Sequence, residues 1–176
     1  MKIGIISDVH DNLRHLSKAI NFFNEEKIEL LVNCGDWCMP FTMRTYVPLK
    51  CPIKGVLGNG DPDMQKFLYQ LQNFDILKNL DLDLSPRFLD FTIDGIRFGV
   101  SHGDDENLRK YLIESQIFDV LCLGHTHIPI VEKREKTLVI NPGSLVGYMQ
   151  ETGIESVTVA LYDTNQKDGK IIDLGI

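Results

Sequence analysis

Short apolar runs separated by a helical pattern characterise the first part of the chain. Runs at residues 2–6, 30–34 and 53–57 are rich in Ile, Leu and Val, which is typical of buried parallel strands. Between the first two runs, Asn12 can cap a helix whose apolar positions recur every three or four residues. These positions are Leu13, Leu16, Ile20 and Phe23. The pattern predicts alternating strands and helices around a parallel sheet.

Two further helices are expected. Asp61 and Pro62 open the second helix, because proline suits a first helical turn. Its apolar face carries Phe67, Leu71 and Phe74. Asp104 or Asp105 can cap the third helix, which runs to about residue 115. The segment from 36 to 52 is interrupted by prolines and is expected to be irregular.

The pattern of apolar and polar residues changes in the second half, where short apolar segments alternate with residues typical of turns. The expected strands are 88–93, 96–100, 120–123, 128–134, 137–140, 156–162 and 170–174. Asp94-Gly95 and Asp168-Gly169 are two-residue hairpin signals, which favour antiparallel neighbours. We therefore expect a single domain over residues 1–176 of the α/β class. Its architecture is a β-sandwich of two mixed sheets flanked by α-helices.

Composition narrows the class of function. The 176 residues carry a net charge of −7, so extended nucleic acid is not an expected partner. No run approaches the roughly 20 apolar residues of a membrane span, and the N-terminus lacks the pattern of a signal peptide. We expect a cytoplasmic protein with no membrane contact. Cys34 and Cys122 lie in apolar runs and are expected in the core, and no Cys-x-x-Cys pair is present.

Side chains that can bind metal follow the predicted strands one after another. The motifs are Asp8-Val9-His10, Gly35-Asp36, Gly58-Asn59-Gly60-Asp61, Ser101-His102-Gly103-Asp104 and Gly124-His125-Thr126-His127. Strand ends are where ligands gather in α/β sheets, and these side chains suit a pair of divalent cations. We expect Asp8 and His10 to share a face, as positions i and i+2 do in an extended chain. The sequence thus indicates a two-metal hydrolase.

Each motif alone has a simpler interpretation. The pair Asp8 and His10 is commonly a helix cap beside a surface histidine, and Gly-Asp or Asn-Gly often forms a turn. His102 could be a hydrogen-bonded core histidine, and His15 is expected on a helix surface. The joint occurrence of the motifs, at successive strand ends, favours the metal site over these readings.

The order of the motifs resembles that of the calcineurin-like metallophosphoesterases. The short length and the Asn-Pro-Gly-Ser segment at 141–144 are most similar to the small bacterial and archaeal phosphodiesterases of that superfamily. This resemblance implies a dinuclear metal centre at the strand ends of a two-sheet sandwich. The implied ligands are Asp8, His10 and His127 for one ion, Asn59, His102 and His125 for the other, and Asp36 as the bridge.

The resemblance also implies the chemistry. It predicts a metal-dependent phosphoric diester hydrolase that attacks small phosphodiesters with a hydroxide activated by the two ions. The implied catalytic residues are Asn59, His102 and Asp61, with Asp61 and Asn12 orienting the ligands. Mn²⁺ is the preferred metal, and Fe²⁺, Zn²⁺ or Ni²⁺ are alternatives.

The chain departs from the family pattern at several positions. Larger relatives have a histidine at position 60, where this chain has glycine and therefore no side chain that can protonate a leaving group. They also carry a second aspartate shortly after Asp36, which is absent here. Asp104 replaces a histidine of small relatives and is read as a helix cap or a further acid near the site. We expect activated or cyclic diesters to be the better substrates.

Three alternatives stay open from the sequence. One is a protein-binding scaffold of this fold, like the retromer subunit that lacks key histidines, although this chain keeps all the proposed ligands. The others are a phosphomonoesterase and a nuclease, which usually carry additional cationic groups or basic surfaces. A homo-oligomer is also an open prediction, because the segment at 41–47 is hydrophobic.

Overall fold

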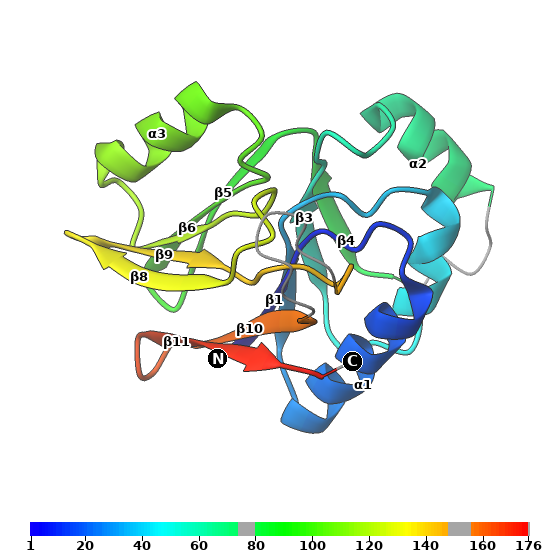
Figure 1. Ribbon diagram of the computed structural model, residues 1–176, viewed down its shortest axis with the longest axis horizontal. Helices are drawn as coiled ribbons and strands as arrows, with labels where there is room; N and C mark the ends of the chain where they lie inside the picture. Colours follow the sequence, from blue (N-terminus) through cyan, green and yellow to red (C-terminus); the bar gives the residue numbers. More distant parts are fainter. Residues whose placement is uncertain (74–79, 148–155, 176) are drawn as a thin grey trace.

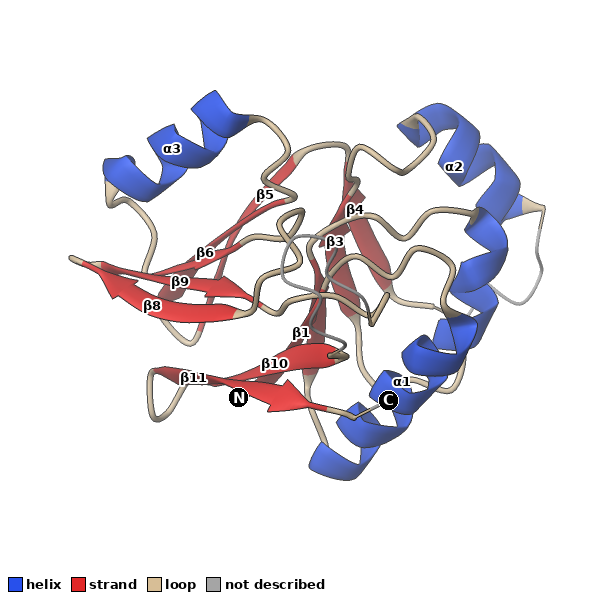
Figure 2. Cartoon of the chain, in the orientation of Figure 1, coloured by secondary structure: helices blue, strands red, loops and turns tan. Residues whose placement is uncertain are grey.

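The computed structural model describes residues 1–73, 80–147 and 156–175 (Figure 1). Two sheets face each other, and helices cover their outer sides (Figure 2). The helices are α1 (Leu13–Glu26), the 3-10 helix η1 (Pro40–Tyr46), α2 (Met64–Gln72) and α3 (Glu106–Ser115). This arrangement confirms the expected α/β sandwich. Among the described residues, no helix combines the length and apolar character that a membrane crossing requires.

The first sheet has the strand order β11-β10-β1-β2-β3-β4. Its strands are β11 (Asp168–Asp173), β10 (Thr158–Asp163), β1 (Lys2–Ile6), β2 (Leu30–Asn33), β3 (Ile53–Val56) and β4 (Leu82–Ser85). The strands β1 to β4 are mutually parallel, whereas β10 is antiparallel to both of its neighbours. The carboxyl ends of β1, β2 and β3 therefore meet at one edge of the sheet.

The second sheet has the strand order β5-β6-β7-β9-β8. Its strands are β5 (Phe88–Ile93), β6 (Ile96–Ser101), β7 (Val120–Cys122), β8 (Ile130–Arg134) and β9 (Thr137–Asn141). The strands β6, β7 and β9 are parallel, and hairpins add β5 and β8 in antiparallel orientation. The carboxyl ends of β6, β7 and β9 form a second edge.

Apolar side chains form three packed layers between these elements. The inner faces of the two sheets meet in a buried cluster that includes Ile5, Val32, Phe98 and Cys122. A second cluster joins α1, η1 and α2 to the outer face of the first sheet, and α3 covers the outer face of the second. Figure 1 shows α1 and α2 on one side of the molecule and α3 on the other. This packing holds the two strand-end edges together.

Several local expectations need correction. The segment after Asp36 is not wholly irregular, because Pro40–Tyr46 forms η1 and packs against α1. Within it Met43 and Tyr46 are fully buried, while Phe41 and Val47 stay partly exposed. Two of the four apolar residues of this segment are thus core residues, so only Phe41 and Val47 are left for the predicted oligomer contact.

The start of the second helix and one turn differ from the prediction, whereas the third helix uses one of its two predicted caps. The second helix begins at Met64, and Asp63 rather than Asp61 accepts a hydrogen bond from the first turn, at Lys66 N. The third helix is capped by Asp105, whose carboxylate accepts from Leu108 N at 3.0 Å. The last hairpin turns before Asp168, which is already paired in β11. Phe74, expected on the second helix, lies outside the described residues.

Candidate metal centre

Loops from both sheets bring the predicted ligands to one place. The loops follow β1, β2 and β3 of the first sheet and β6 and β7 of the second. Two sets of three side chains converge, and within each set the ligand atoms all lie within 4.8 Å of one another. One set is Asp8, His10 and His127, and the other set is Asp8, Asp36 and His102. Ligands separated by more than a hundred residues in the sequence therefore meet at the strand ends.

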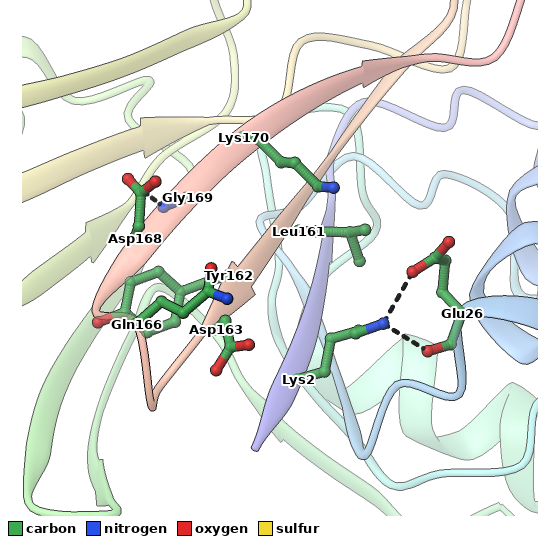
Figure 3. A pocket seen from close by; sticks show the side chains of 9 residues that line it. All are labelled: Lys2, Glu26, Leu161, Tyr162, Asp163, Gln166, Asp168, Gly169 and Lys170. Atoms are coloured by element: carbon green, nitrogen blue, oxygen red, sulfur yellow. Dashed lines mark hydrogen bonds and ion pairs between the residues drawn. The ribbon is translucent and has the colours of Figure 1, made fainter.

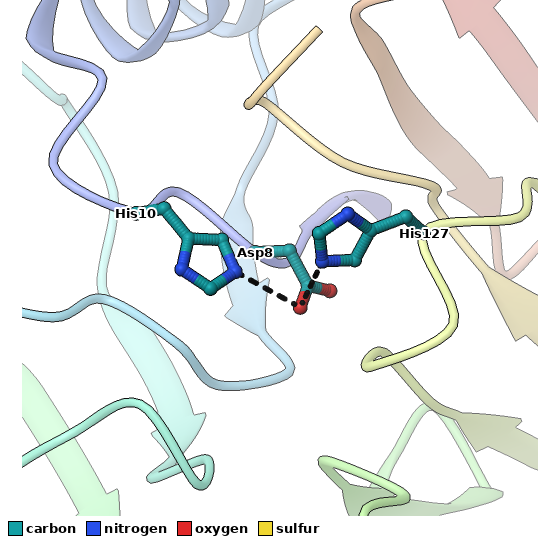
Figure 4. A group of neighbouring side chains, drawn as sticks. All are labelled: Asp8, His10 and His127. Atoms are coloured by element: carbon teal, nitrogen blue, oxygen red, sulfur yellow. Dashed lines mark ion pairs between the residues drawn. The ribbon is translucent and has the colours of Figure 1, made fainter. Parts of the chain in front are cut away.

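Asp8 lies at the centre of the cluster and is fully buried. Its Oδ2 accepts a hydrogen bond of 3.0 Å from the backbone of His125. Its Oδ1 is 3.1 Å from His127 Nε2 and 3.7 Å from His10 Nε2, but has no hydrogen-bond partner (Figure 4). A buried carboxylate oxygen without a partner is costly. Because two imidazole nitrogens face the same oxygen, these three atoms can together act as ligands of a cation.

The turns that carry the ligands have an unusual backbone. Asp8, His10, Asp36, His125 and His127 all have positive φ, between +44° and +66°. Residues other than glycine rarely adopt this left-handed conformation, which costs free energy and tends to occur at functional sites. The side chains of Asp8 and His10 do converge, but the extended-chain reasoning for this was wrong. Tight left-handed turns bring them together instead.

Asp36 lies between two histidine groups, which are His10 with His127 and His102 with His125. Its Oδ2 is 3.4 Å from His10 Nε2, and its Oδ1 is 3.4 Å from His102 Nε2. Oδ1 also accepts a hydrogen bond of 2.7 Å from Gly60 N. Each oxygen thus faces a histidine of a different group. A carboxylate in this position can contact two cations at once.

His102 is almost fully buried and has a fixed orientation. Its Nδ1 donates to the carbonyl oxygen of Cys34 at 2.9 Å, because a carbonyl can only accept. This leaves the Nε2 lone pair directed toward Asn59 Oδ1, 3.1 Å away, and toward Asp36. Three acceptor atoms then face one another, which is unfavourable without a proton or cation between them. His102 and Asn59 therefore fit a second cation site.

His125 completes the predicted set. Its ring packs against that of His102 with centroids 5.2 Å apart, and the His10 and His127 rings are paired in the same way at 5.3 Å. His125 is exposed to solvent, in contrast to His102. The structure thus brings all seven predicted ligands into one cluster. His15 is not among them: its Nδ1 is 2.8 Å from the carbonyl oxygen of Leu145, so it is half-buried rather than a free surface residue.

Asp61 supports the loops rather than facing the cluster with a free oxygen. Its Oδ2 accepts from Gly58 N at 2.8 Å and Asp36 N at 3.0 Å, and its Oδ1 accepts from Cys38 N at 2.5 Å. Three amide groups of two different loops are therefore tied to one carboxylate. This geometry explains how Asp61 positions Asp36, which agrees with an orienting role.

Two glycines let these loops approach each other. Gly35 has φ of +105°, so it provides the left-handed turn before Asp36. At Gly58 an added Cβ would overlap Asp36 Oδ1. Any other residue at Gly58 would therefore displace the Asp36 carboxylate.

Several contributing residues were not recognised from strand-end chemistry. Asn141 Nδ2 donates to Gly124 O at 2.8 Å, which anchors the loop of His125 and His127. Ser144 Oγ donates to Asp8 O at 3.1 Å. Asn141 is the last residue of β9, the next parallel strand, and Ser144 follows it, so their position at a strand end was the available signal. Cys38 Sγ lies 3.5 Å from His10 Nδ1.

The ionisation of these groups depends on their mutual contacts. The Asp8 carboxylate, followed by Cys38, raises the pKa of His10 to about 10. Burial tends to raise the pKa of Asp8, but His10 and His127 outweigh it and hold that pKa far below its usual range. Burial lowers and Asp36 raises the pKa of His102, with a net increase. Burial raises the pKa of Asp61 to about 6, although amide groups bond to its oxygens. Without a cation, His10 therefore holds a proton beside Asp8 at neutral pH.

A separate hollow of about 270 Å³ lies at the opposite end of the first sheet (Figure 3). It is formed around Lys2, the first residue of β1, and residues of β10 and β11. Lys2 Nζ is bound by Glu26 Oε2 at 2.8 Å and by Glu26 O at 3.0 Å. The hollow is thus remote from the strand ends that carry the cluster.

The sequence matches known proteins along nearly its whole length. The profile of the calcineurin-like phosphoesterase superfamily domain matches residues 1–167. A phosphodiesterase of Methanocaldococcus jannaschii is 35% identical over 174 residues, which cover 99% of each chain. A probable metallophosphoesterase of Methanothermobacter thermautotrophicus is 30% identical over 182 residues, covering 99% of this chain and 94% of the relative.

Solved structures show the same fold. An archaeal phosphodiesterase superposes with a TM-score of 0.84 at 34% identity, covering 98% of this chain and 99% of that one. Vps29 of Entamoeba histolytica, solved with zinc, has a TM-score of 0.64 at 18% identity, covering 99% and 100%. The second likeness concerns the fold alone. The family match and the close relatives confirm the resemblance inferred from the motifs: the chain belongs to the calcineurin-like phosphoesterase superfamily and is a hydrolase of that class.

Proposed function

We propose that this protein is a phosphodiesterase that hydrolyses small phosphodiesters with two divalent metal ions. The position of Asp36 carries the proposal, because its two oxygens each lie 3.4 Å from a histidine of a different group. The relative from Methanocaldococcus jannaschii, a phosphodiesterase 35% identical over nearly the full chain, supports the reaction type.

The donor atoms suggest how the ions would be held. Asp8, His10 and His127 would bind one ion, and Asn59, His102 and His125 would bind the other. Asp36 would contact both. Imidazole, carboxylate and amide donors together suit Mn²⁺, which we propose as the preferred metal. When bound, the two ions would supply positive charge that polarises the phosphoryl oxygens and acidifies a water molecule.

The chain's own residues prepare the site for this charge. Asp8 and Asp36 provide buried negative charge, and the Cys34 carbonyl holds the His102 ring in the tautomer that directs Nε2 to the centre. Asp61 fixes the loops of Asp36 and Gly58 relative to each other. Preorganised groups of this kind do not need to rearrange during the reaction.

Position 60 has no side chain that could donate a proton to the leaving group. Gly60 is exposed and offers only its backbone amide, which is already bonded to Asp36. A substrate whose leaving group is stable as an anion needs no proton donor. Activated and strained cyclic diesters are therefore the proposed substrates.

The test is hydrolysis of bis-p-nitrophenyl phosphate by metal-stripped protein refilled with Mn²⁺. We expect activity that requires the metal and is lost in His102→Ala. His15→Gln is the matched control, because His15 is the histidine outside the ligand set and glutamine can still donate to Leu145 O. Folded protein that is inactive with Mn²⁺, Zn²⁺ and Fe²⁺ would overturn the proposal and favour the protein-binding scaffold.

A further inference from the structure

A groove of about 450 Å³ opens directly beside the proposed centre. It is formed by the loop after β3 and by residues that follow β4 and β6. Its lining residues include Asn59, Pro62, Met64, Pro86, Arg87 and Asp104. Because Asn59 Oδ1 lies 3.1 Å from His102 Nε2, a phosphoryl group at the centre would have one ester substituent next to this groove. The volume is within the range of pockets that hold small organic ligands.

The groove combines apolar walls with one pair of opposite charges. Pro62 and Met64 are half-buried and Pro86 is exposed, which offers surface for a flat ring. Arg87 Nη1 and Asp104 Oδ2 are 3.9 Å apart, which is too long for a hydrogen bond. Asp104 is not used as a helix cap, since Asp105 has that role. The Arg87 guanidinium, which can donate hydrogen bonds, and the Asp104 carboxylate, which can accept them, therefore lie side by side at the wall of the groove.

The charges of the groove restrict what can occupy it. Asp61, Asp63 and Asp104 oppose a single arginine among the lining residues. A substituent with a further negative charge would be repelled. Amide groups already bond to both oxygens of Asp61 and to one oxygen of Asp63, so these two carboxylates offer few free acceptor atoms to a cation. A neutral group with both hydrogen-bond donors and acceptors fits best.

We propose that this groove binds the nucleoside part of a nucleotide diester, and that Arg87 and Asp104 determine this specificity. A nucleobase is flat, neutral and presents acceptors beside donors on its edge. Arginine and aspartate read such edges by donating to carbonyl oxygens or ring nitrogens and by accepting from N–H groups. This inference rests on the proposed function, because it assigns the substrate class of the same site.

The experiment compares substrates that share one leaving group. Wild-type protein with Mn²⁺ is given the p-nitrophenyl esters of thymidine 5′-phosphate, methyl phosphate and phosphorylcholine. We expect the highest kcat/KM for the thymidine ester. Arg87→Ala and Asp104→Asn should each reduce the ratio of thymidine to methyl ester by about tenfold, mainly through KM, because a hydrogen bond to a charged group is lost.

An exposed arginine–aspartate pair outside the groove provides the matched control. Arg97 binds Asp90 at 2.6 and 3.0 Å between β5 and β6. Arg97→Ala and Asp90→Asn should leave the substrate ratio unchanged. Equal kcat/KM for the thymidine and methyl esters in the wild type would overturn the inference. So would a preference for the phosphorylcholine ester, or equal losses on both esters in the Arg87 and Asp104 variants.

A binding measurement separates this inference from the proposed function. Calorimetric titration of the metal-loaded protein with thymidine 5′-monophosphate needs no turnover. Binding that weakens in Arg87→Ala but not in Arg97→Ala would support the groove even if no ester were hydrolysed. Hydrolysis of bis-p-nitrophenyl phosphate together with identical nucleotide binding in both variants would overturn the groove and leave the phosphodiesterase proposal intact.

Discussion

The Nε2 atom of His102 and the Oδ1 atom of Asp36 face each other at 3.4 Å, at the junction of the two sheets. His102 follows β6 and Asp36 follows β2, so this pair joins the second sheet to the first. Asp36 also faces His10 through its other oxygen. The two residues should therefore differ in their effect on metal binding: Asp36 serves both groups, while His102 serves one.

Metal content tests this difference. We expect His102→Ala to retain about one Mn²⁺ per chain where the wild type holds about two, because the first group stays intact. Asp36→Asn should weaken the binding of both ions, since it removes a charge between the two groups. Elemental analysis after dialysis measures the content, with His15→Gln as the control. Loss of both ions in His102→Ala would contradict separate sites.

Asp61 should matter although neither of its oxygens is free. In Asp61→Asn an amide NH₂ would face backbone N–H groups that the carboxylate now satisfies. We expect the activity or metal affinity to fall roughly 10- to 100-fold, as for residues that orient metal ligands. Asp105→Ala is the control, because Asp105 accepts a backbone N–H at α3 and should affect only stability, by about 1 kcal/mol. Unchanged metal affinity in Asp61→Asn would rule out the orienting role.

Close backbone approach at two glycines gives a graded prediction. An added Cβ at Gly58 would overlap Asp36 Oδ1, whereas at Gly60 the Cβ would lie 3.1 Å from the same carboxylate. We expect Gly58→Ala to abolish metal-dependent activity and to lower the melting temperature. Gly60→Ala should lose less, because a shift of a few tenths of an ångström relieves the contact. Thermal melts and hydrolysis rates compare the two; a milder effect at Gly58 would refute the packing argument.

Much of this site could be predicted because ligand chemistry is local in sequence. Motifs such as Gly-His-Thr-His end buried strands, and parallel strands align their carboxyl ends. The backbone of these motifs could not be predicted, because five ligands adopt positive φ, which residues other than glycine rarely do. An orienting role for Asp61 was predicted, but its contacts could not be, since its Asp-Pro context favoured a helix start while two of its partners, Asp36 and Cys38, lie in the loop after β2. The predicted cytoplasmic location and single domain remain predictions.

The absence of a side chain at Gly60 predicts the dependence on leaving group. Without a proton donor there, the rate should fall steeply as the leaving alcohol becomes more basic. Methyl esters of p-nitrophenyl, phenyl and ethyl phosphate provide the series, with hydrolysis measured at one pH. We expect p-nitrophenolate to leave fastest and ethoxide too slowly to detect. Similar rates across the series would indicate a proton donor elsewhere in the site.

The ionisation of His10 predicts a pH dependence of stability in metal-free protein. Asp8 and Cys38 raise the pKa of His10 to about 10 in the folded state, above its value of 6.5 in the unfolded chain. A raised pKa contributes stability that is fully present below pH 6.5 and is lost as the pH rises toward 10. The difference in free energy of unfolding between wild type and His10→Gln should therefore shrink over this interval.

Chemical denaturation at several pH values, after metal removal, measures this difference. The effect should be modest, because the His10 side chain is about one-third exposed and solvent screens its charge. With Mn²⁺ bound, His10 must be deprotonated, so the same pH trend should disappear and metal affinity should increase with pH. A wild-type advantage that grows from pH 6.5 to 10 in the metal-free protein would contradict the assigned direction of the His10 pKa.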